Sequence, residues 1–209
     1  MIKKINSNSP LLTIGLPVYN RENFIGKRLD NILSQTFHDF TILIYDNSND
    51  STPEICKDYV KRDSRIKHVH EDKSKIKHKG AAPSQVFAFN YVLQNADTDF
   101  FVWAASDDLW ASDFLAKNVE ILKKQSDVVG SIGQVKRYGP KIHEFKENTE
   151  DSFLVKKYKK FRRRFRPVEI FSIIGSSYEK RVTQFLKTQD ELSMYAVFRT
   201  QPLQKSFVL

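Results

Sequence analysis

The sequence predicts an α/β fold in which helices flank a doubly wound, mostly parallel central sheet. Short apolar runs alternate along the chain with segments whose apolar residues recur every three or four positions, the spacing of one helix face. The apolar runs end in polar or acidic residues, as buried parallel strands do where they meet ligand-binding loops. This order is typical of a doubly wound sheet, followed here by a short, divergent and mainly helical C-terminal part.

Each element can be placed from its own signals. The first strand is expected to break at Pro17, and the helix after the second strand begins with Thr52 as its cap and Pro53 in its first turn. Residues 127–135 are expected to form a strand pair or one bent strand. The expected strands are 11–20, 39–45, 66–70 and the run from Phe100. The expected helices are 24–35, 52–62, 84–95, 113–124 and 167–174, with a helical or mixed tail to Leu209.

Composition sets the class of protein. A chain of 209 residues can bury a core, and its content of 40% hydrophobic and 12% aromatic residues excludes a disordered protein. The single cysteine, Cys56, can form no internal disulfide, so we expect a reducing, cytoplasmic setting. No apolar run approaches the roughly twenty residues that span a bilayer. The net charge of +9 predicts attraction to phosphates or other anions.

Composition also divides the chain into two parts. Residues 1–135 hold the predicted sheet, whereas residues 136–209 are polar and turn-rich at first and become strongly basic at 156–166. This basic segment fits a solvated loop or helix face, a contact with an anionic membrane surface or, least well, nucleic acid. Because no nucleic-acid-binding fold signature is present, we expect no nucleic-acid partner. Peripheral contact with the inner face of the membrane stays open.

Two adjacent carboxylates, Asp107 and Asp108, follow the apolar run that begins at Phe100. Because like charges repel, such a pair is favoured where a cation or a ligand hydroxyl compensates it. Helix capping is the alternative, since Asp108 or Ser112 could cap the helix expected from residue 113. From these residues alone, both interpretations stand.

Four stretches in this order resemble the family 2 glycosyltransferases, enzymes with the GT-A nucleotide-sugar fold. They are GLPVYN at 15–20, SQTF at 34–37, YDNSNDST at 45–52 and ASDDLW at 105–110. The resemblance covers roughly residues 10 to 125 and is looser beyond them. It implies a GT-A type nucleotide-sugar-binding core in residues 1–135 and a partial acceptor-side region in residues 136–209.

The resemblance implies a site for a nucleoside-diphosphate sugar. At its nucleoside end, Asp46 would accept a hydrogen bond from a ring N–H of the base, and Pro17 and Tyr19 would touch the nucleotide. Considered without the family, Asp46 and its neighbours also fit an Asx turn, and Tyr19 fits a packed side chain at a strand end.

At the diphosphate end, the resemblance assigns Asp107 to the ribose and Asp108 to the Mg²⁺ or Mn²⁺ ion that bridges the diphosphate. Ala105 stands where many relatives have another acid, which makes the metal depend more on Asp108. Lys79 would pair with phosphate, with a solvated lysine loop as the alternative. His70 has no metal-ligand spacing with another His or Cys and is expected at the surface.

An inverting transfer also needs a general base that takes a proton from the acceptor hydroxyl. In the family this base is an acid near a helix start, well after the metal motif, and Asp190 and Glu191 are the adjacent acids in that part. Residues 194–206 resemble the segment that precedes the base in relatives, so the acceptor-side region is expected to be truncated. Three explanations stay open: one of these acids is the base, the chain is a shortened inactive form, or a partner supplies the missing half.

The resemblance as a whole implies a glycosyltransferase that transfers a sugar with inversion. The donor would be a UDP- or dTDP-linked sugar, and the acceptor a glycan or a lipid-linked molecule in polysaccharide or cell-envelope biosynthesis. The alternative is a non-catalytic nucleotide-sugar-binding or scaffolding protein that lacks the general base. A nucleotidyltransferase is less favoured, because that class has a Gly-rich, Arg-containing loop where this chain has Pro17 to Asn20.

Overall fold

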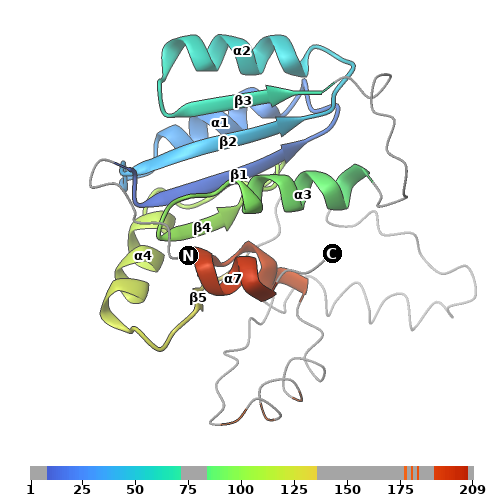
Figure 1. Cartoon of the computed structure of the whole chain (residues 1–209). Coiled ribbons are helices and arrows are strands. Elements are labelled where there is room, and N and C mark those ends of the chain that lie inside the picture. Colours follow the sequence, from blue (N-terminus) through green and yellow to red (C-terminus); the bar gives the residue numbers. More distant parts are fainter. Residues whose placement is uncertain are drawn as a thin grey trace, which may run out of the picture. The chain divides into compact units, whose positions relative to one another are not determined.

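The computed structural model of the chain describes residues 9–71, 84–135, 177, 180, 183 and 191–206 (Figure 1). The chain divides into two compact units, one formed by Met1–Ile132 with Met194–Leu209 and the other by Gly133–Ser193. The first unit holds the sheet. It combines most of the predicted nucleotide-sugar-binding core with the last residues of the chain. The acceptor-side role expected for residues 136–209 stays a prediction.

A six-stranded sheet runs through the first unit in the order β3-β2-β1-β4-β6-β5. The first four strands of this order are parallel, and β6 pairs antiparallel with both β4 and β5. The strands are β1 Leu12–Val18, β2 Phe40–Asp46, β3 Ile66–His70, β4 Phe100–Trp103, β5 Gly130–Ser131 and β6 Val197–Arg199. The predicted doubly wound, mostly parallel sheet is thereby confirmed.

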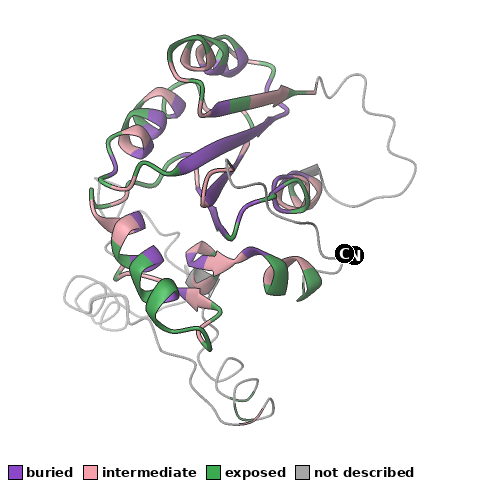
Figure 2. Ribbon diagram, turned by 60° about the vertical axis from the view of Figure 1, so that its left-hand side comes forward, coloured by how far each residue is buried: buried purple, intermediate pink, exposed green. Residues whose placement is uncertain are grey.

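Helices cover both faces of this sheet. They are α1 Ile25–Leu33, α2 Thr52–Arg62, α3 Ser84–Gln94, α4 Phe114–Lys124 and α7 Thr200–Ser206, and Glu191–Tyr195 forms the 3-10 turn η3. In β2, Ile42 and Ile44 enter a core with α1, α2 and α4, whereas Leu43 and Tyr45 enter a second core with α3, because successive side chains of a strand alternate between faces. Figure 2 shows buried residues on the strands and on the sheet-facing sides of the helices. Each large apolar side chain buried there contributes about 1.5–3 kcal/mol.

Gly15 of β1 allows close packing in the second core. A Cβ at this position would lie 2.6 Å from the ring of Phe101 and 2.7 Å from a methyl group of Val92 on α3. Only glycine therefore leaves room for α3 and the β4 aromatic side chain over the centre of the sheet.

The strand β1 continues through Pro17, so the predicted break there is wrong. The carbonyl of Gly15 accepts a hydrogen bond from the N–H of Ala104 at 2.8 Å. The backbone N–H and C=O groups of the odd-numbered residues of β1 therefore face β4. The pairing of β1 with β4 ends at Gly15. Pro17 thus lies past the end of β4, where its missing N–H removes no hydrogen bond of the sheet.

The strand expected at 127–135 is shorter than predicted, and it pairs with a strand from the end of the chain. Only Gly130–Ser131 forms β5, and it pairs with β6. Arg199 strengthens this junction, because its backbone N–H donates to the Val129 carbonyl and its Nε donates to the Val128 carbonyl, both at 2.9 Å. The C-terminal part thus contributes a strand of the sheet as well as the helix α7.

Some predictions fall outside the described residues: the helix at 167–174, the basic segment 156–166 and the loop that contains Lys79. Among the helices that the structure does describe, none combines the length and the apolar character needed to cross a bilayer.

Candidate functional site

The loops that follow β1, β2 and β4 leave the sheet at the same edge. β1 lies between β2 and β4, so the order of strands along the chain runs from β1 to β2 and β3 on one side and then to β4 on the other side. Ligands of open parallel sheets bind at such a switch point, beyond the carboxyl ends of the strands. Asp46 ends β2, and Asp107 and Asp108 follow β4, so the structure brings the predicted residues to one edge, on either side of β1.

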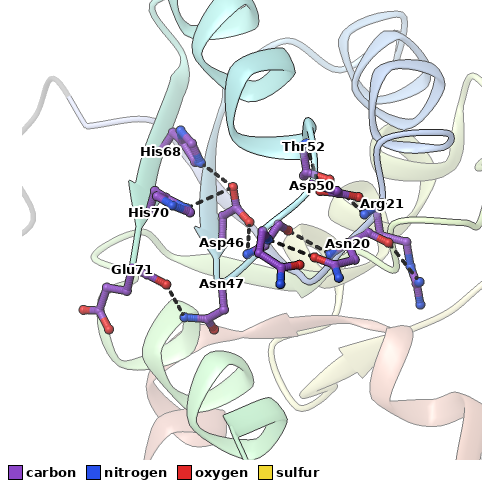
Figure 3. A network of polar contacts seen from close by, with 11 residues as sticks. Asn20, Arg21, Asp46, Asn47, Asp50, Thr52, His68, His70 and Glu71 are labelled. Carbon is purple, nitrogen blue, oxygen red and sulfur yellow. Dashed lines mark hydrogen bonds and ion pairs between the residues drawn. The ribbon is translucent and has the colours of Figure 1, made fainter. Parts of the chain in front are cut away.

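Hydrogen bonds tie the loop after β1 to the loop after β2 (Figure 3). The N–H of Asn20 donates to Ser48 Oγ at 2.8 Å, and Asn20 Oδ1 accepts from the N–H of Asn49 at 3.0 Å. Asn20 has a φ of 51°, in the left-handed region that asparagine tolerates better than most residues. The N–H of Arg21 donates to Thr52 Oγ1 at 2.8 Å, which fixes the start of α2.

A second set of contacts extends this network to the end of β4. Arg21 Nε donates to Ser106 Oγ at 3.1 Å, one residue before the acidic pair. Nearby, Asp50 Oδ2 accepts from the N–H of Glu22, and Glu22 Oε2 accepts from the N–H of Ser51. The three loops therefore form one connected rim. Sequence reasoning missed Arg21, whose role depends on a contact across 85 positions of the chain.

Asp46 is fully buried, and both of its carboxylate oxygens have partners. Oδ1 accepts the N–H of Ser48 at 2.8 Å, which is the Asx turn that the sequence offered as an alternative. Oδ2 lies 3.0 Å from Nε2 of His68 and 3.5 Å from Nδ1 of His70 (Figure 3). A ring N–H of a base would have to share an oxygen with these groups or replace one of them. The assignment of Asp46 to the base stays a prediction.

The register of β2 and β3 explains why both imidazoles reach this carboxylate. Ile44 lies opposite His68 and Asp46 opposite His70. Because every second residue of a strand faces the same side, the two histidines share the side of Asp46. His70 is partly exposed, as expected, whereas the side chain of His68 is 5% exposed and was missed by the sequence analysis. Burial by itself raises the pKa of Asp46, but hydrogen bonds with His68 and Ser48 outweigh it and hold the pKa below its usual value.

Cys56 lies beside this carboxylate, on the inward face of α2. A carboxylate oxygen of Asp46, Sγ of Cys56 and a ring nitrogen of His68 lie within 4.8 Å of one another. Burial raises the pKa of the Cys56 thiol to about 12, and the negative charges of Asp46 and Asp50 add to the effect.

The acidic pair contrasts with Asp46, because Asp107 and Asp108 are exposed. Loss of solvation, together with the charge of Asp107, raises the pKa of Asp108, and the positive charge of Arg28 opposes this shift. Tyr195, in the returning C-terminal segment, also has a raised pKa, through loss of solvation and then the charges of Asp108 and Asp107. This tyrosine was not predicted as a site residue, because only the fold brings it near the acids.

The loop that holds the acidic pair is braced by α1. Asn31 makes two hydrogen bonds to the backbone of Trp110, both at 2.9 Å, and the guanidinium of the buried Arg28 lies 4.0 Å from the centre of the Trp110 ring. Gln35 Nε2 donates to the carbonyl of Ala111 at 2.8 Å. The Gln35 contact gives a physical reason for part of the SQTF stretch, which the sequence analysis used only as a family likeness.

The remaining predicted residues differ in how far the structure describes them. Tyr19 follows β1 and is 47% exposed, and Pro17 is half-buried within the strand. Lys79, Asp190 and the side chain of Glu191 lie outside the described residues. The capping alternative for the acidic pair is wrong, because α4 has Asp113 at its N-cap instead of Asp108 or Ser112.

The acidic pair fits the divalent metal that the resemblance implies. Two adjacent exposed carboxylates offer the hard oxygen ligands that Mg²⁺ and Mn²⁺ prefer. The raised pKa of Asp108 means that its charged form is incompletely compensated by the protein, and a bound cation would supply that compensation.

The sequence model of the family described as Glycosyl transferase family 2 matches residues 13–207. The chain belongs to glycosyl transferase family 2. Over 118 residues it is 30% identical to TuaG of Bacillus subtilis, a glycosyltransferase whose name assigns it to teichuronic acid biosynthesis. That match covers 56% of the chain and 44% of TuaG.

Solved structures agree with this family and its GT-A fold. The mannosyltransferase PcManGT from Pyrobaculum calidifontis, in complex with GDP-Man and Mn²⁺, is 28% identical, with a TM-score of 0.50 over 63% of this chain and 37% of that one. TarS 1-349 from S. aureus, in complex with UDP-GlcNAc, is 16% identical, with a TM-score of 0.57 over 94% of this chain and 47% of that one, a likeness of fold alone. The chain spans less than half the length of each of these proteins and of TuaG.

Proposed function

We propose that this family 2 domain binds a nucleoside-diphosphate sugar and, within the complete protein, transfers the sugar to a glycan or lipid-linked acceptor in polysaccharide or cell-envelope biosynthesis. The proposal is carried by the placement of Asp46 on one side of β1 and of Asp107 and Asp108 on the other. Family membership supports the reaction class, and the name of TuaG supports the pathway. The PcManGT complex with GDP-Man and Mn²⁺ supports a metal-dependent donor site.

At the nucleoside end, Asp46 accepts a hydrogen bond from the base, and the exposed ring of Tyr19 packs against it, beside Pro17. The base that a carboxylate suits carries a ring N–H, as uracil, thymine and guanine do. Asp107 accepts a hydrogen bond from a ribose hydroxyl. The hydrogen-bonded rim between the loops holds these groups in place before the donor arrives.

At the diphosphate end, Asp108 would hold Mg²⁺ or Mn²⁺, and Lys79 would add a positive charge. When bound, such an ion neutralises the diphosphate as the sugar leaves it. Asp190 or Glu191 takes the proton from the acceptor hydroxyl as that oxygen attacks the anomeric carbon, which inverts the configuration at this carbon.

Titration calorimetry with UDP, dTDP and GDP, each with and without Mn²⁺, tests the donor site. We expect Mn²⁺-dependent binding of at least one of them, and loss of the Mn²⁺ dependence in Asp108→Asn. Asp127→Asn removes the same charge from an exposed position near the end of α4 and is expected to bind like wild type. If none of the three nucleotides shows Mn²⁺-dependent binding, the proposed donor site is contradicted.

The general base is tested by turnover. Donor hydrolysis or sugar transfer by the purified chain is expected to fall strongly in Asp190→Asn or in Glu191→Gln, and the variant that loses turnover but keeps donor binding identifies the base. A wild-type chain that binds the donor without turnover would instead support the non-catalytic nucleotide-sugar-binding alternative.

A further inference from the structure

We propose that Asp46, Cys56 and His68 form a second metal site, for a thiophilic divalent cation such as Zn²⁺, separate from the acidic pair. The three residues come from the end of β2, from α2 and from β3. Each offers one ligand atom, and these atoms lie within 4.8 Å of one another. Asp46 and Cys56 have no exposed surface, and the side chain of His68 is 5% exposed, so the three are fixed by packing.

The spacing is close to that of a tetrahedral zinc site. Bonds of about 2.0–2.3 Å to zinc place neighbouring ligand atoms roughly 3.3–3.8 Å apart. Asp46 Oδ2 and His68 Nε2 are 3.0 Å apart, slightly less than this range, and Cys56 Sγ lies within 4.8 Å of both ligand atoms, so a bound ion requires shifts of these side chains. The N–H of Ser48 holds the other carboxylate oxygen at 2.8 Å, an outer contact of the kind that orients metal ligands.

His70 lies beside this arrangement and is partly exposed. Its Nδ1 lies 3.5 Å from the same Asp46 oxygen, and its side chain is 29% exposed. The imidazole lies outside the group of three mutually close ligand atoms, so it would have to move toward Cys56 and His68 to serve as a fourth ligand. Sequence spacing alone pointed away from this site, because Asp46, Cys56, His68 and His70 match no metal-binding motif.

The ligand types separate the two metal sites by chemistry. The acidic pair presents only carboxylate oxygens, which select hard ions such as Mg²⁺ and Mn²⁺. Binding of Zn²⁺ or Co²⁺ would displace the proton of the Cys56 thiol, whose pKa of about 12 makes affinity rise with pH. The resulting thiolate, imidazole nitrogen and carboxylate form a set that favours these ions. We therefore expect Zn²⁺ and Co²⁺ to bind at Asp46 even when the acidic pair has been removed.

Cobalt absorption of the full chain without nucleotide tests the site. Cys56 is the single cysteine of the sequence, so a thiolate-to-cobalt charge-transfer band can arise from no other residue. We expect this band to saturate at one Co²⁺ per chain, together with the visible bands of tetrahedral cobalt, and to disappear on addition of Zn²⁺. Absence of the charge-transfer band in the wild-type chain would mean that these side chains are only a hydrogen-bonded pair beside a core cysteine, and would overturn the proposal.

Variants assign the ligands. Cys56→Ser should lose the charge-transfer band, and His68→Gln should keep Cys56 but weaken Co²⁺ binding at least about tenfold. The double variant Asp107→Asn/Asp108→Asn should bind Co²⁺ as wild type does. Circular dichroism checks that each variant is folded, and His68→Gln keeps the test decisive if Cys56→Ser unfolds. A band that persists in Cys56→Ser, or unchanged affinity in a folded His68→Gln, contradicts the assignment.

One consequence rests on the proposed function. An ion on Asp46 engages the oxygen that the base requires, so Zn²⁺ should weaken nucleotide binding in the wild-type chain and have less effect in Cys56→Ser. Equal weakening in both chains would overturn this competition. Failure of every nucleotide to bind would count against the proposed function and would leave the cobalt result, obtained without nucleotide, unchanged.

Discussion

The two ends of the candidate site place carboxylates in opposite surroundings. At the end of β2, Asp46 is fully buried and receives hydrogen bonds from Ser48 and His68, and its pKa is lowered. After β4, Asp107 and Asp108 are exposed and repel each other, and the pKa of Asp108 is raised. The charge of Asp46 is compensated by hydrogen bonds within the protein, whereas the charge of Asp108 is disfavoured by loss of solvation and by Asp107. The same rim thus carries one carboxylate whose charge the fold stabilises and one whose charge the fold opposes.

The largest effect should follow from removing the compensation of Asp46. His68→Ala leaves a buried carboxylate short of its closest imidazole partner, and breaking a buried pair is costly, so we expect a loss of about 3 kcal/mol in the free energy of unfolding. His38→Ala, at an exposed position, should change it by less than about 0.5 kcal/mol. Urea denaturation followed by circular dichroism measures both. Equal stability of the two variants would show that Asp46 does not depend on His68.

The next effect concerns β1, the strand that lies between the two ends of the site. Gly15→Ala places a methyl group 2.6 Å from the Phe101 ring and should cost about 1–3 kcal/mol. Gly26→Ala, within α1, is the matched control, because its added methyl group would lie 3.7 Å from Tyr59 Oη, an ordinary contact distance. We expect this helical substitution to stabilise the protein by roughly 0.5–1 kcal/mol. Thermal unfolding should therefore move in opposite directions, and a shift of the same sign would contradict the packing.

A smaller effect should come from the brace of the acidic loop. Asn31→Ala removes two hydrogen bonds to the backbone of Trp110, which predicts a loss of about 1–2 kcal/mol and looser binding of Mn²⁺ with nucleotide. Asn49→Ala, at an exposed position after β2, should stay within about 0.5 kcal/mol of wild type. Denaturation and calorimetry on the same samples separate stability from binding. If Asn31→Ala is as stable as Asn49→Ala, the acidic loop does not depend on this brace.

The smallest effect is a difference in pH dependence. The pKa of Asp46 is lowered in the folded state, so its contribution to stability is present above the unfolded pKa and is lost as pH falls through the folded pKa. The pKa of Asp108 is raised, so its charge opposes folding at neutral pH, and this cost disappears as pH falls through the folded pKa.

Unfolding measured across acidic and neutral pH checks these signs. Asp46→Asn should reduce the loss of stability on acidification. The free energy of unfolding of Asp108→Asn should remain within about 0.5 kcal/mol of the wild-type value. Any gain in stability should be confined to neutral pH. If the two substitutions change the pH profile in the same direction, the contrast between the two ends is wrong.

Sequence patterns predicted the parts of the fold that depend on local spacing. The apolar runs of β1, β2 and β4 and the helical periodicity of α1, α2 and α4 are long enough to identify each element. Pro17 was interpreted as a strand break, because the end of its neighbour β4 could not be known. The three-residue strand β6 was missed, since a strand of that length carries no measurable alternation, and its pairing with β4 and β5 brings together distant parts of the chain.

The order of residues by itself determined an α/β chain whose acidic groups follow two strands, because hydrophobic periodicity and turn chemistry act over neighbouring positions. Only the tertiary structure decided what surrounds each acid. The register of β2 with β3 sets both histidines on the side of Asp46, and the return of the C-terminal segment brings Tyr195 near Asp107 and Asp108. Burial and charge act through space, so carboxylates that look alike in the sequence acquire opposite pKa shifts once the sheet has formed.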